Sequence, residues 1–358
     1  MNLLSQLKKV LYITIAWTLV ALFINVIGMS AVLDRNVIQN VDPTELELDY
    51  YLAFFGSIIE SVIGGLVGGS AIVFVWEKWL RSKPYGWTLK NIVLSFVIIF
   101  IITAIPVILF NNTYNNDVSV FSKQAWLEVL EAFQTPSLLI PFFFWMAVVI
   151  MTFIFLQVND KYGPGVFKKF LLGKYFHPTR EERIFMFLDL RSSTAIAEKL
   201  GEEKYFNFIR EVFKIVTPAI LKNEGEIYQY VGDEIVISWP MNEGLKNASC
   251  VRTYSDVESS IKENIDFFIS TYGVEPEFKA GVHGGYVMAG ELGIVKREIA
   301  YSGDVLNTAA RIQAMCNELK VNLLVSGEIV KALKQDNFQS KGFINLRGKS
   351  ERMELFTI

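Results

Sequence analysis

The sequence contains little cysteine, no excess of basic charge and no internal repeat or low-complexity tract. Its two cysteines, Cys250 and Cys316, are too few for a disulfide-rich scaffold. Lysine and arginine number 34 against 37 aspartate and glutamate residues, and this net charge of −3 argues against a nucleic-acid-binding protein. Apolar side chains, in contrast, make up 52% of the 358 residues, and nearly all of the excess precedes residue 160. One uniform globular domain is therefore excluded.

Four stretches of the first half are long and apolar enough to cross a bilayer, which takes roughly 20 mostly apolar residues. They are Leu11–Leu33, Tyr51–Trp76, Ile92–Phe110 and Ser137–Val158. Basic residues gather at the N-terminus, between the second and third stretch, and after the fourth, whereas the other two loops are mostly acidic. Because basic residues in short loops stay in the cytoplasm, we expect residues 1–158 to form a four-helix, multi-pass bundle in the plasma or inner membrane with both ends cytoplasmic. The two cysteines would then be reduced thiols.

The second stretch has two features that a plain anchor does not need. Gly64/Gly68 and Gly65/Gly69 are pairs that allow close helix approach, either within one bundle or between two subunits. Glu60, one turn earlier, is an ionisable group near the apolar span, and it is a candidate for a ligand or signal role or for pairing with a neighbouring helix.

Residues 159–182 predict a juxtamembrane linker. Gly163-Pro164-Gly165 breaks any helix, and Val166–Phe176 then mixes phenylalanine and leucine with three lysines. Such a segment lies in the headgroup region or serves as a plain linker. In either case it has to carry any signal from the bundle to the second half.

Residues 183–358 show the pattern of a soluble α/β domain. Short apolar runs alternate with helical periodicity, and Gly232-Asp233 is a two-residue hairpin signal. Expected strands are 184–188, 226–231, 234–239, 277–283, 286–289, 299–301, 322–325, 343–346 and 353–357. Expected helices are 195–223, broken near Gly201 and bent at Pro218, then 245–272, and one from Val305 with Asp304 as N-cap; Gly284-Gly285 is expected to form a turn. This order predicts a split βαββαβ sheet with extra hairpins.

Two aspartates mark one end of that sheet. Asp189 ends an apolar strand, and Asp233 sits at a hairpin tip. If the two strands are neighbours, the carboxylates converge, and converging carboxylates repel each other unless a cation lies between them. Mg²⁺ is the natural choice, because it binds through one or two carboxylates together with substrate phosphates.

Two further groups suit a phosphorylated ligand. Ser192, Ser193 and Thr194 precede a helix, where hydroxyl and free N–H groups favour an anion. Asn307 and Arg311 stand four apart and so share one helix face, where an amide and a guanidinium suit a sugar oxygen and a phosphoryl group. His283, in contrast, is expected to be packed or solvated rather than catalytic.

Four segments of the second half match one family in order. They are Phe187–Thr194, Tyr230–Asp233, Gly281–Gly285 with Gly290 downstream, and Ser302–Arg311. Together they resemble the catalytic domain of class III nucleotidyl cyclases, the adenylyl and guanylyl cyclases. The resemblance covers about half of the chain and implies a membrane-bound cyclase whose catalytic domain is α+β and ferredoxin-like.

The resemblance also implies a role for each matching position. Asp189 and Asp233 correspond to the aspartates that hold two Mg²⁺ or Mn²⁺ ions in each active site, with the Leu190 carbonyl as a further ligand. The turn of Ser192, Ser193 and Thr194 corresponds to the turn that binds the triphosphate. Asn307 corresponds to the residue that orients the ribose, Arg311 to the one that stabilises the transition state, and Arg347 to a phosphate-binding lysine.

The implied assembly is a homodimer with shared sites, each taking its metals from one subunit and its Asn/Arg pair from the other. The implied reaction is attack of the ribose 3′-hydroxyl on the α-phosphate of a nucleoside triphosphate, with loss of pyrophosphate. The base-reading positions depart from the family, with Gln229 and Ala300 where adenylyl cyclases usually have a lysine and an aspartate or threonine. ATP is favoured by analogy, and GTP or a pyrimidine triphosphate stays open.

Two other functions stay open at this point. A catalytically weak domain could bind a nucleotide and report to a partner, and a transporter could carry a cytosolic regulatory domain. The intact set of Asp189, Asp233, Asn307 and Arg311 argues against the first, and four spans without a repeat argue against the second.

Overall fold

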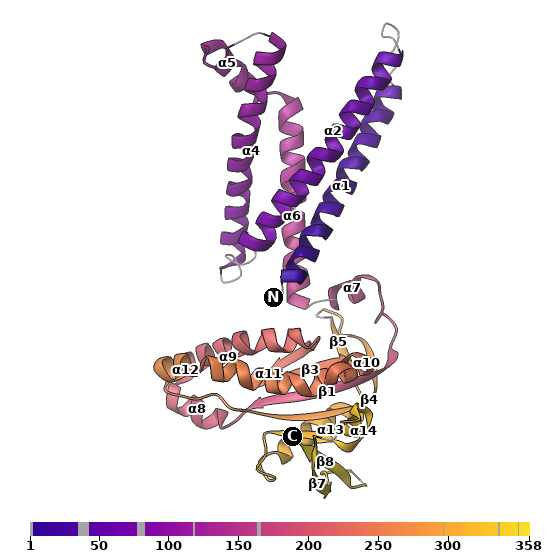
Figure 1. Ribbon diagram of the computed structural model, residues 1–358, viewed down its shortest axis with the longest axis vertical. Helices are drawn as coiled ribbons and strands as arrows, with labels where there is room; N and C mark the ends of the chain where they lie inside the picture. The colour runs from indigo at the N-terminus through magenta and orange to yellow at the C-terminus, as the bar shows by residue number, and fades with distance from the viewer. Residues whose placement is uncertain are drawn as a thin grey trace. The chain divides into compact units, whose positions relative to one another are not determined.

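The computed structural model divides the chain into two compact units, Met1–Val158 and Asn159–Ile358 (Figure 1). It describes residues 3–34, 43–76, 83–116, 119–162, 166–295, 297–335, 337–349 and 351–358. Residues 159–182, which the sequence suggested as a separate linker, group with the second unit.

The first unit consists of long helices. They are α1 (Leu3–Asp34), α2 (Pro43–Ser70) with its π-helical continuation η2 (Ala71–Trp76), α4 (Tyr85–Asn116), α5 (Lys123–Ala132) and α6 (Pro136–Tyr162). Within the described residues, four stretches are long and apolar enough to span a membrane: Gln6–Ile27, Phe54–Trp76, Tyr85–Phe110 and Pro136–Asn159. In the 18-residue apolar window of each stretch only 11–29% is buried, so most side chains there are not buried, as lipid-facing helices require. The four predicted spans are confirmed as helices of this length and composition, and their orientation stays a prediction.

Three of the four paired glycines of α2 serve packing within this unit, whereas a Cβ atom on Gly64 would meet nothing within 4 Å. A Cβ atom on Gly65 would lie 2.8 Å from the Cα of Thr14, and one on Gly68 would lie 2.8 Å from the ring of Trp17. Both residues belong to α1, so the absent side chains let the two helices meet. The side chain of Glu60 lies outside the described residues, and its role is untested.

The second unit is built on one eight-stranded sheet in the order β2-β3-β1-β4-β6-β8-β7, with β5 paired to β4. The strands are β1 (Thr179–Leu190), β2 (Glu226–Val231), β3 (Glu234–Pro240), β4 (Phe278–Leu292), β5 (Glu298–Ser302), β6 (Leu323–Ser326), β7 (Gln339–Ile344) and β8 (Met353–Thr357). The first four pair with one another in antiparallel fashion and follow the order of a split βαββαβ sheet. The remaining strands, including the parallel pair β4–β6, extend the sheet beyond that simple description.

The second unit also contains helices, several of which cover the two faces of the sheet. They are α7 (Val166–Leu171), α8 (Ser193–Leu200), α9 (Glu202–Lys222), α10 (Met241–Leu245) with the 3₁₀ turn η3 (Lys246–Ala248), α11 (Ser249–Glu263), α12 (Ile265–Tyr272), α13 (Asp304–Met315) and α14 (Gly327–Leu333). Figure 1 shows α9 and α11 over one face and α13 over the other.

Strand β1 explains this arrangement, because successive side chains of a strand point to opposite faces. Ile184, Met186 and Leu188 are buried in the core that includes Phe208 of α9, whereas Phe185 packs with residues of α13 on the other face.

The predicted turn at Gly284-Gly285 is wrong, because β4 runs through both residues. A Cβ on Gly284 would lie 2.7 Å from the side chain of Ile329, and one on Gly285 would lie 3.0 Å from that of Val305. These glycines therefore admit helices α14 and α13 close to the strand. Glycine in a strand marks close approach as often as a turn.

Other elements differ in detail from the predictions. Pro218 lies inside α9 without ending it, and the expected helix 245–272 is divided into shorter helices. Gly303 is the N-cap of α13, and Asp304 lies in its first turn, where a carboxylate still favours the helix dipole. Helix α14 was not predicted, and β7 begins at Gln339, earlier than expected. Strands β2 and β8 have the predicted bounds.

Candidate active site

Asp189 and Asp233 lie at the same end of neighbouring strands. Asp189 on β1 is paired with Glu234, the first residue of β3, and Gly232-Asp233 is the two-residue turn that precedes it. Gly232 has a φ of 63°, which glycine adopts without strain. The two carboxylates are close enough for the charge of one to act on the other. The expected pairing of the two strands is therefore observed, and metal binding by the two aspartates stays a prediction.

Negative charge accumulates at this end of the sheet, which we call the acidic edge and define by Asp189, Asp233 and Glu234. Partial burial raises the pKa of Asp189, and the neighbouring Asp233 raises it further, against the opposing effect of Lys279. Burial, followed by the charges of Asp189 and Asp233, raises the pKa of Glu234 to about 7. Unbalanced carboxylates of this kind favour a cation.

The donor set at the acidic edge fits a hard divalent cation. Carboxylate and carbonyl oxygens suit Mg²⁺ and Mn²⁺. Within the described parts of the chain, no three His, Cys, Asp or Glu side chains are arranged as a metal-binding cluster. The protein thus offers a partial shell of two aspartates, which substrate phosphates and water would complete. The Leu190 carbonyl remains a predicted ligand.

Two side chains that sequence reasoning missed contact Asp189 directly. The Lys279 ammonium on β4 lies 3.1 Å from Asp189 Oδ2, and Gln313 of α13 donates from Nε2 to the same oxygen at 2.8 Å. Lys279 is the residue paired with Asp189 across β1 and β4. No local pattern gives this register, because β1 and β4 are far apart along the chain.

The predicted phosphate-binding turn follows the acidic edge along the chain. Ser192 has a left-handed backbone, with a φ of 54°, and its side chain makes no capping bond to α8. Burial, and then the charge of Asp233, raises the pKa of Tyr205 on α9, against the opposing effect of Ser193. Thr194 is exposed. The turn therefore keeps the side chains of Ser192 and Thr194 exposed, a few residues after Asp189 in the chain.

Asn307 and Arg311 occupy a different place. Asn307 is exposed and Arg311 is half-buried, one turn apart on α13. Among the described residues, no hydrogen bond or ion pair joins either side chain to Asp189 or Asp233. The assignment of the metal ligands and the Asn/Arg pair to two different subunits therefore stays a prediction.

A basic turn lies against Arg311. Arg347 is exposed between β7 and β8, and a Cβ on the next residue, Gly348, would lie 3.4 Å from both amino nitrogens of Arg311. Lys349 forms an ion pair with Asp304 in the first turn of α13. This turn thus adds positive charge to the helix that bears the Asn/Arg pair.

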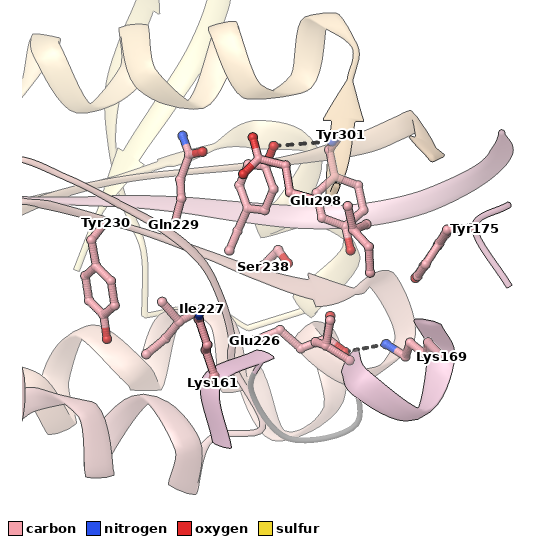
Figure 2. A pocket seen from close by; sticks show the side chains of 13 residues that line it. Lys161, Lys169, Tyr175, Glu226, Ile227, Gln229, Tyr230, Ser238, Glu298 and Tyr301 are labelled. Atoms are coloured by element: carbon pink, nitrogen blue, oxygen red, sulfur yellow. Dashed lines mark hydrogen bonds and ion pairs between the residues drawn. The ribbon is translucent and has the colours of Figure 1, made fainter. Parts of the chain in front are cut away.

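A cavity of about 280 Å³ lies beside the predicted base-reading positions (Figure 2). It is lined by Lys161, Val166, Lys169, Tyr175, Glu226, Ile227, Tyr228, Gln229, Tyr230, Ser238, Glu298, Ile299 and Tyr301. Gln229 contributes directly, and Ala300 stands in β5 between two lining residues. Tyr301 donates its backbone N–H to the Tyr228 hydroxyl at 3.3 Å, which ties β5 to β2 beside the cavity.

A buried ion-pair network supports the floor of this cavity. Arg183 of β1, only 1% exposed, donates to Glu226, to Ser238 at 2.9 Å and to Glu181 at 3.1 Å. Its guanidinium also lies 4.8 Å from the centre of the Tyr301 ring. Lys169 of α7 is 2.6 Å from Glu226, so the segment that follows the last membrane helix is attached to the same network.

The adenylate and guanylate cyclase catalytic domain family matches residues 177–358, about half of the chain. The chain belongs to this family. Adenylate cyclase 2 of Rhizobium meliloti is 32% identical over 206 residues, which are 57% of this chain and 57% of that protein. Adenylate cyclase 1 of the same organism is 25% identical over 50% of this chain and 28% of its own length. This chain therefore spans little more than half of the first relative and less of the second.

The fold agrees with a solved cyclase. A bacterial light-regulated adenylyl cyclase structure aligns with a TM-score of 0.51 at 22% identity, over 60% of this chain and 63% of that one. In this cyclase domain, the four matching segments are brought to the places described above: the acidic edge, its turn, β4 and α13. His283 of β4 is buried and hydrogen-bonded to Ser326 at 2.9 Å, so it is packed as expected.

Proposed function

We propose that the chain is a membrane-anchored adenylate cyclase that works as a homodimer and converts ATP to 3′,5′-cyclic AMP and pyrophosphate. The observation that carries the proposal is the pair of converging aspartates beside a hydroxyl-rich turn, in a domain of the cyclase family. Four apolar helices support membrane attachment, with the cyclase domain on the cytoplasmic side.

Asp189 and Asp233, with the Leu190 carbonyl, would hold the divalent cations. When bound, Mg²⁺ or Mn²⁺ supplies Lewis-acid chemistry, which makes the ribose 3′-hydroxyl a better nucleophile and holds the departing pyrophosphate. The turn of Ser192, Ser193 and Thr194 binds triphosphate oxygens through hydroxyl and N–H groups.

The second subunit of the proposed dimer completes each site. Asn307 orients the ribose, and Arg311 meets the charge that builds on the transferring phosphoryl group. The 3′-oxygen forms its bond to the α-phosphorus as the bond to the pyrophosphate oxygen breaks, and the hydroxyl proton leaves to solvent. Arg347, beside Arg311, holds phosphate oxygens by charge-assisted hydrogen bonds.

Base selection depends on Gln229, because Ala300 offers no polar side-chain atom. An amide both donates and accepts, so Gln229 can meet either purine. ATP is favoured because the two most similar relatives named above are adenylate cyclases. GTP is the alternative, since guanylate cyclase 2G of Rattus norvegicus is 23% identical over 52% of this chain.

The test uses the full chain, purified in detergent and supplied with each of four nucleoside triphosphates and Mg²⁺ or Mn²⁺. Formation of cyclic AMP with an equal amount of pyrophosphate supports the proposal. A cyclic product from GTP or a pyrimidine triphosphate alone corrects the substrate. Nucleotide binding without any cyclic product points instead to a catalytically weak signalling domain.

Shared sites are tested by mixing two inactive variants. Asp233→Ala chains lack a metal ligand, and Arg311→Ala chains lack the transition-state donor. Mixed dimers contain one composite site with neither change, so partial activity is expected to return. If mixed dimers form, as shown by two affinity tags, and activity stays absent, the shared site is refuted.

A further inference from the structure

Asp189 is contacted by a buried neutral side chain from α13. We propose that Gln313 is a positioning residue, which fixes the Asp189 carboxylate in the orientation that a divalent cation needs. The inference rests on the proposed function only in taking Asp189 as a metal ligand. Gln313 is no part of the four segments that identify the family, since the last of them ends at Arg311.

The contact is a short hydrogen bond from a buried side chain. Gln313 Nε2 donates to Asp189 Oδ2 at 2.8 Å, and Gln313 is only 6% exposed. A buried amide without a partner would be costly, so the bond both satisfies Gln313 and restrains the rotamer of Asp189. Groups that hydrogen-bond to metal ligands orient those ligands and tune their affinity for the metal.

The charge of the donor matters as much as its position. Lys279 lies 3.1 Å from the same carboxylate oxygen, but its positive charge competes with a cation for Asp189. Gln313 is neutral, so it holds the carboxylate without reducing its negative charge. The two contacts therefore have opposite effects on cation binding, and only Gln313 favours it.

The backbone places Gln313 where its side chain reaches Asp189. A Cβ on Gly281 of β4 would lie 2.3 Å from the backbone nitrogen of Gln313 and 2.5 Å from the carbonyl oxygen of Ala309. Helix α13 thus rests directly on the strand backbone at this point. The same β4 segment pairs with β1 next to Asp189, through Leu188 and Ala280. The distance from α13 to the acidic edge is consequently fixed by backbone contacts.

The first experiment measures Mn²⁺ binding to the purified full chain by electron paramagnetic resonance, without nucleotide. Gln313→Met keeps the volume of the side chain and removes the donor, and we expect it to weaken Asp189-dependent Mn²⁺ binding about 10-fold, as loss of such a partner typically does. Asp189→Asn defines the signal that belongs to this site. Thr308→Val is the matched control, because Thr308 is also buried on α13 and its hydroxyl bonds within its own helix.

Gln313→Asn guards against a folding defect. It keeps the amide but withdraws it by one methylene, so it should weaken Mn²⁺ binding. The unfolding temperature of each variant, measured on the same preparation, shows whether that variant is folded at the temperature of the binding experiment. Unchanged Mn²⁺ affinity in a folded Gln313→Met or Gln313→Asn protein overturns the proposal, and so does an equal loss in Thr308→Val. Because this readout needs no turnover, a wild type that binds Mn²⁺ but forms no cyclic nucleotide refutes the proposed function and leaves the inference standing.

The second experiment places Gln313→Met on one chain of the mixed dimer. In the composite site, the Arg311→Ala chain supplies Asp189, whereas the Asp233→Ala chain supplies Asn307 and Arg311. Gln313→Met on the chain that supplies Asp189 is expected to lower the restored activity about 10-fold. The same change on the other chain should leave at least half of it. Equal losses from both placements would mean that Gln313 acts through α13 rather than through Asp189, and would overturn the inference.

Discussion

The two ends of strand β1 hold charge in opposite ways. At the acidic edge, Lys279 pairs with Asp189, and burial and repulsion between carboxylates raise the pKa values of Asp189 and Glu234. At the other end, Arg183 lies among acids. Burial alone would raise the pKa of Glu181, but hydrogen bonds from Lys174 and Arg183 hold it below its usual value.

The difference separates a candidate site from a support. Charges that satisfy one another, like those around Arg183, stabilise the fold only if they stay paired. Charges that repel one another cost stability and persist where a ligand balances them. The same sheet thus has two different ends. The acidic edge, which we call the unbalanced end, suits cation binding. The network around Arg183, which we call the balanced end, supports α7 and the cavity beside Gln229, which we call the base-side cavity.

The largest expected effect comes from removing charge at the unbalanced end. Loss of a residue that hydrogen-bonds to a metal ligand typically costs roughly 10–100-fold. Asp189→Asn or Asp233→Asn removes a proposed ligand itself, so each should reduce cyclic nucleotide formation by more than that. Because each change relieves repulsion, the unfolding temperature should stay equal or rise. Activity and thermal unfolding measured on the same preparation test both parts. Wild-type turnover in either variant would remove the metal assignment.

The opposite result is expected at the balanced end. Arg183→Met leaves Glu181 and Glu226 without their buried partner, and breaking a buried pair in this way costs about 3–5 kcal/mol. The measurement is the free energy of unfolding of the cyclase domain within the full chain. Arg183→Lys is the control, since it keeps the charge and loses the fork that reaches both acids. If Arg183→Met unfolds like the wild type, the network is not a structural support.

Sequence reasoning predicted the acidic edge better than the balanced end, and the reason is physical. Asp233 is placed by a two-residue hairpin that fixes the β2–β3 register locally, and this signal is readable at Gly232. Its approach to Asp189 also needs the pairing of β1 with β3, which the sequence analysis could only assume. Lys279 depends on the pairing of β1 with β4 across some 90 residues, which no local pattern encodes. Gly284 was read as a turn because its true reason, contact with Ile329, exists only in the folded chain.

A smaller effect is expected midway between the two ends, where His283 of β4 is paired with Phe185 of β1. Burial, and then the charge of Lys349, lowers the pKa of His283 from 6.5 to about 4, against the opposite pull of Asp304. Between pH 6.5 and 4, His283 is therefore mostly protonated in the unfolded chain and mostly neutral in the folded chain. Stability should fall as the pH drops from 6.5 toward 4, by about 3 kcal/mol in total.

Unfolding free energies of wild type and His283→Gln, compared at pH 7 and pH 4.5, isolate this contribution. Other acids titrate in both proteins, so the difference between the two pH profiles is the informative quantity. A wild-type profile no steeper than that of His283→Gln between pH 6.5 and 4.5 would show that the ring is protonated in the folded chain. Such a result would place the positive charge of a protonated His283 between the acidic edge and the Arg183 network. The two ends of β1 would then differ less in charge balance.

The smallest expected effect concerns the link between α7 and the balanced end. Lys169 and Glu226 are partly exposed, with side chains 27% and 20% accessible, so their ion pair contributes at most about 1 kcal/mol. Glu226 also contacts Arg183, which stacks on Tyr301 beside the base-side cavity. Lys169→Gln should therefore raise the KM for the triphosphate up to about 5-fold, which corresponds to that energy, and leave kcat unchanged.

Lys222→Gln is the matched control for Lys169→Gln. Lys222 also pairs with a carboxylate, Asp256 at 3.1 Å, but none of its described contacts reaches the cavity. Equal KM values for wild type and Lys169→Gln would show that α7 is only tied to the domain surface. A higher KM in Lys169→Gln, with the control unchanged, would mean that the balanced end does more than support the sheet: it connects the segment after the last membrane helix to the place where the base is expected to bind.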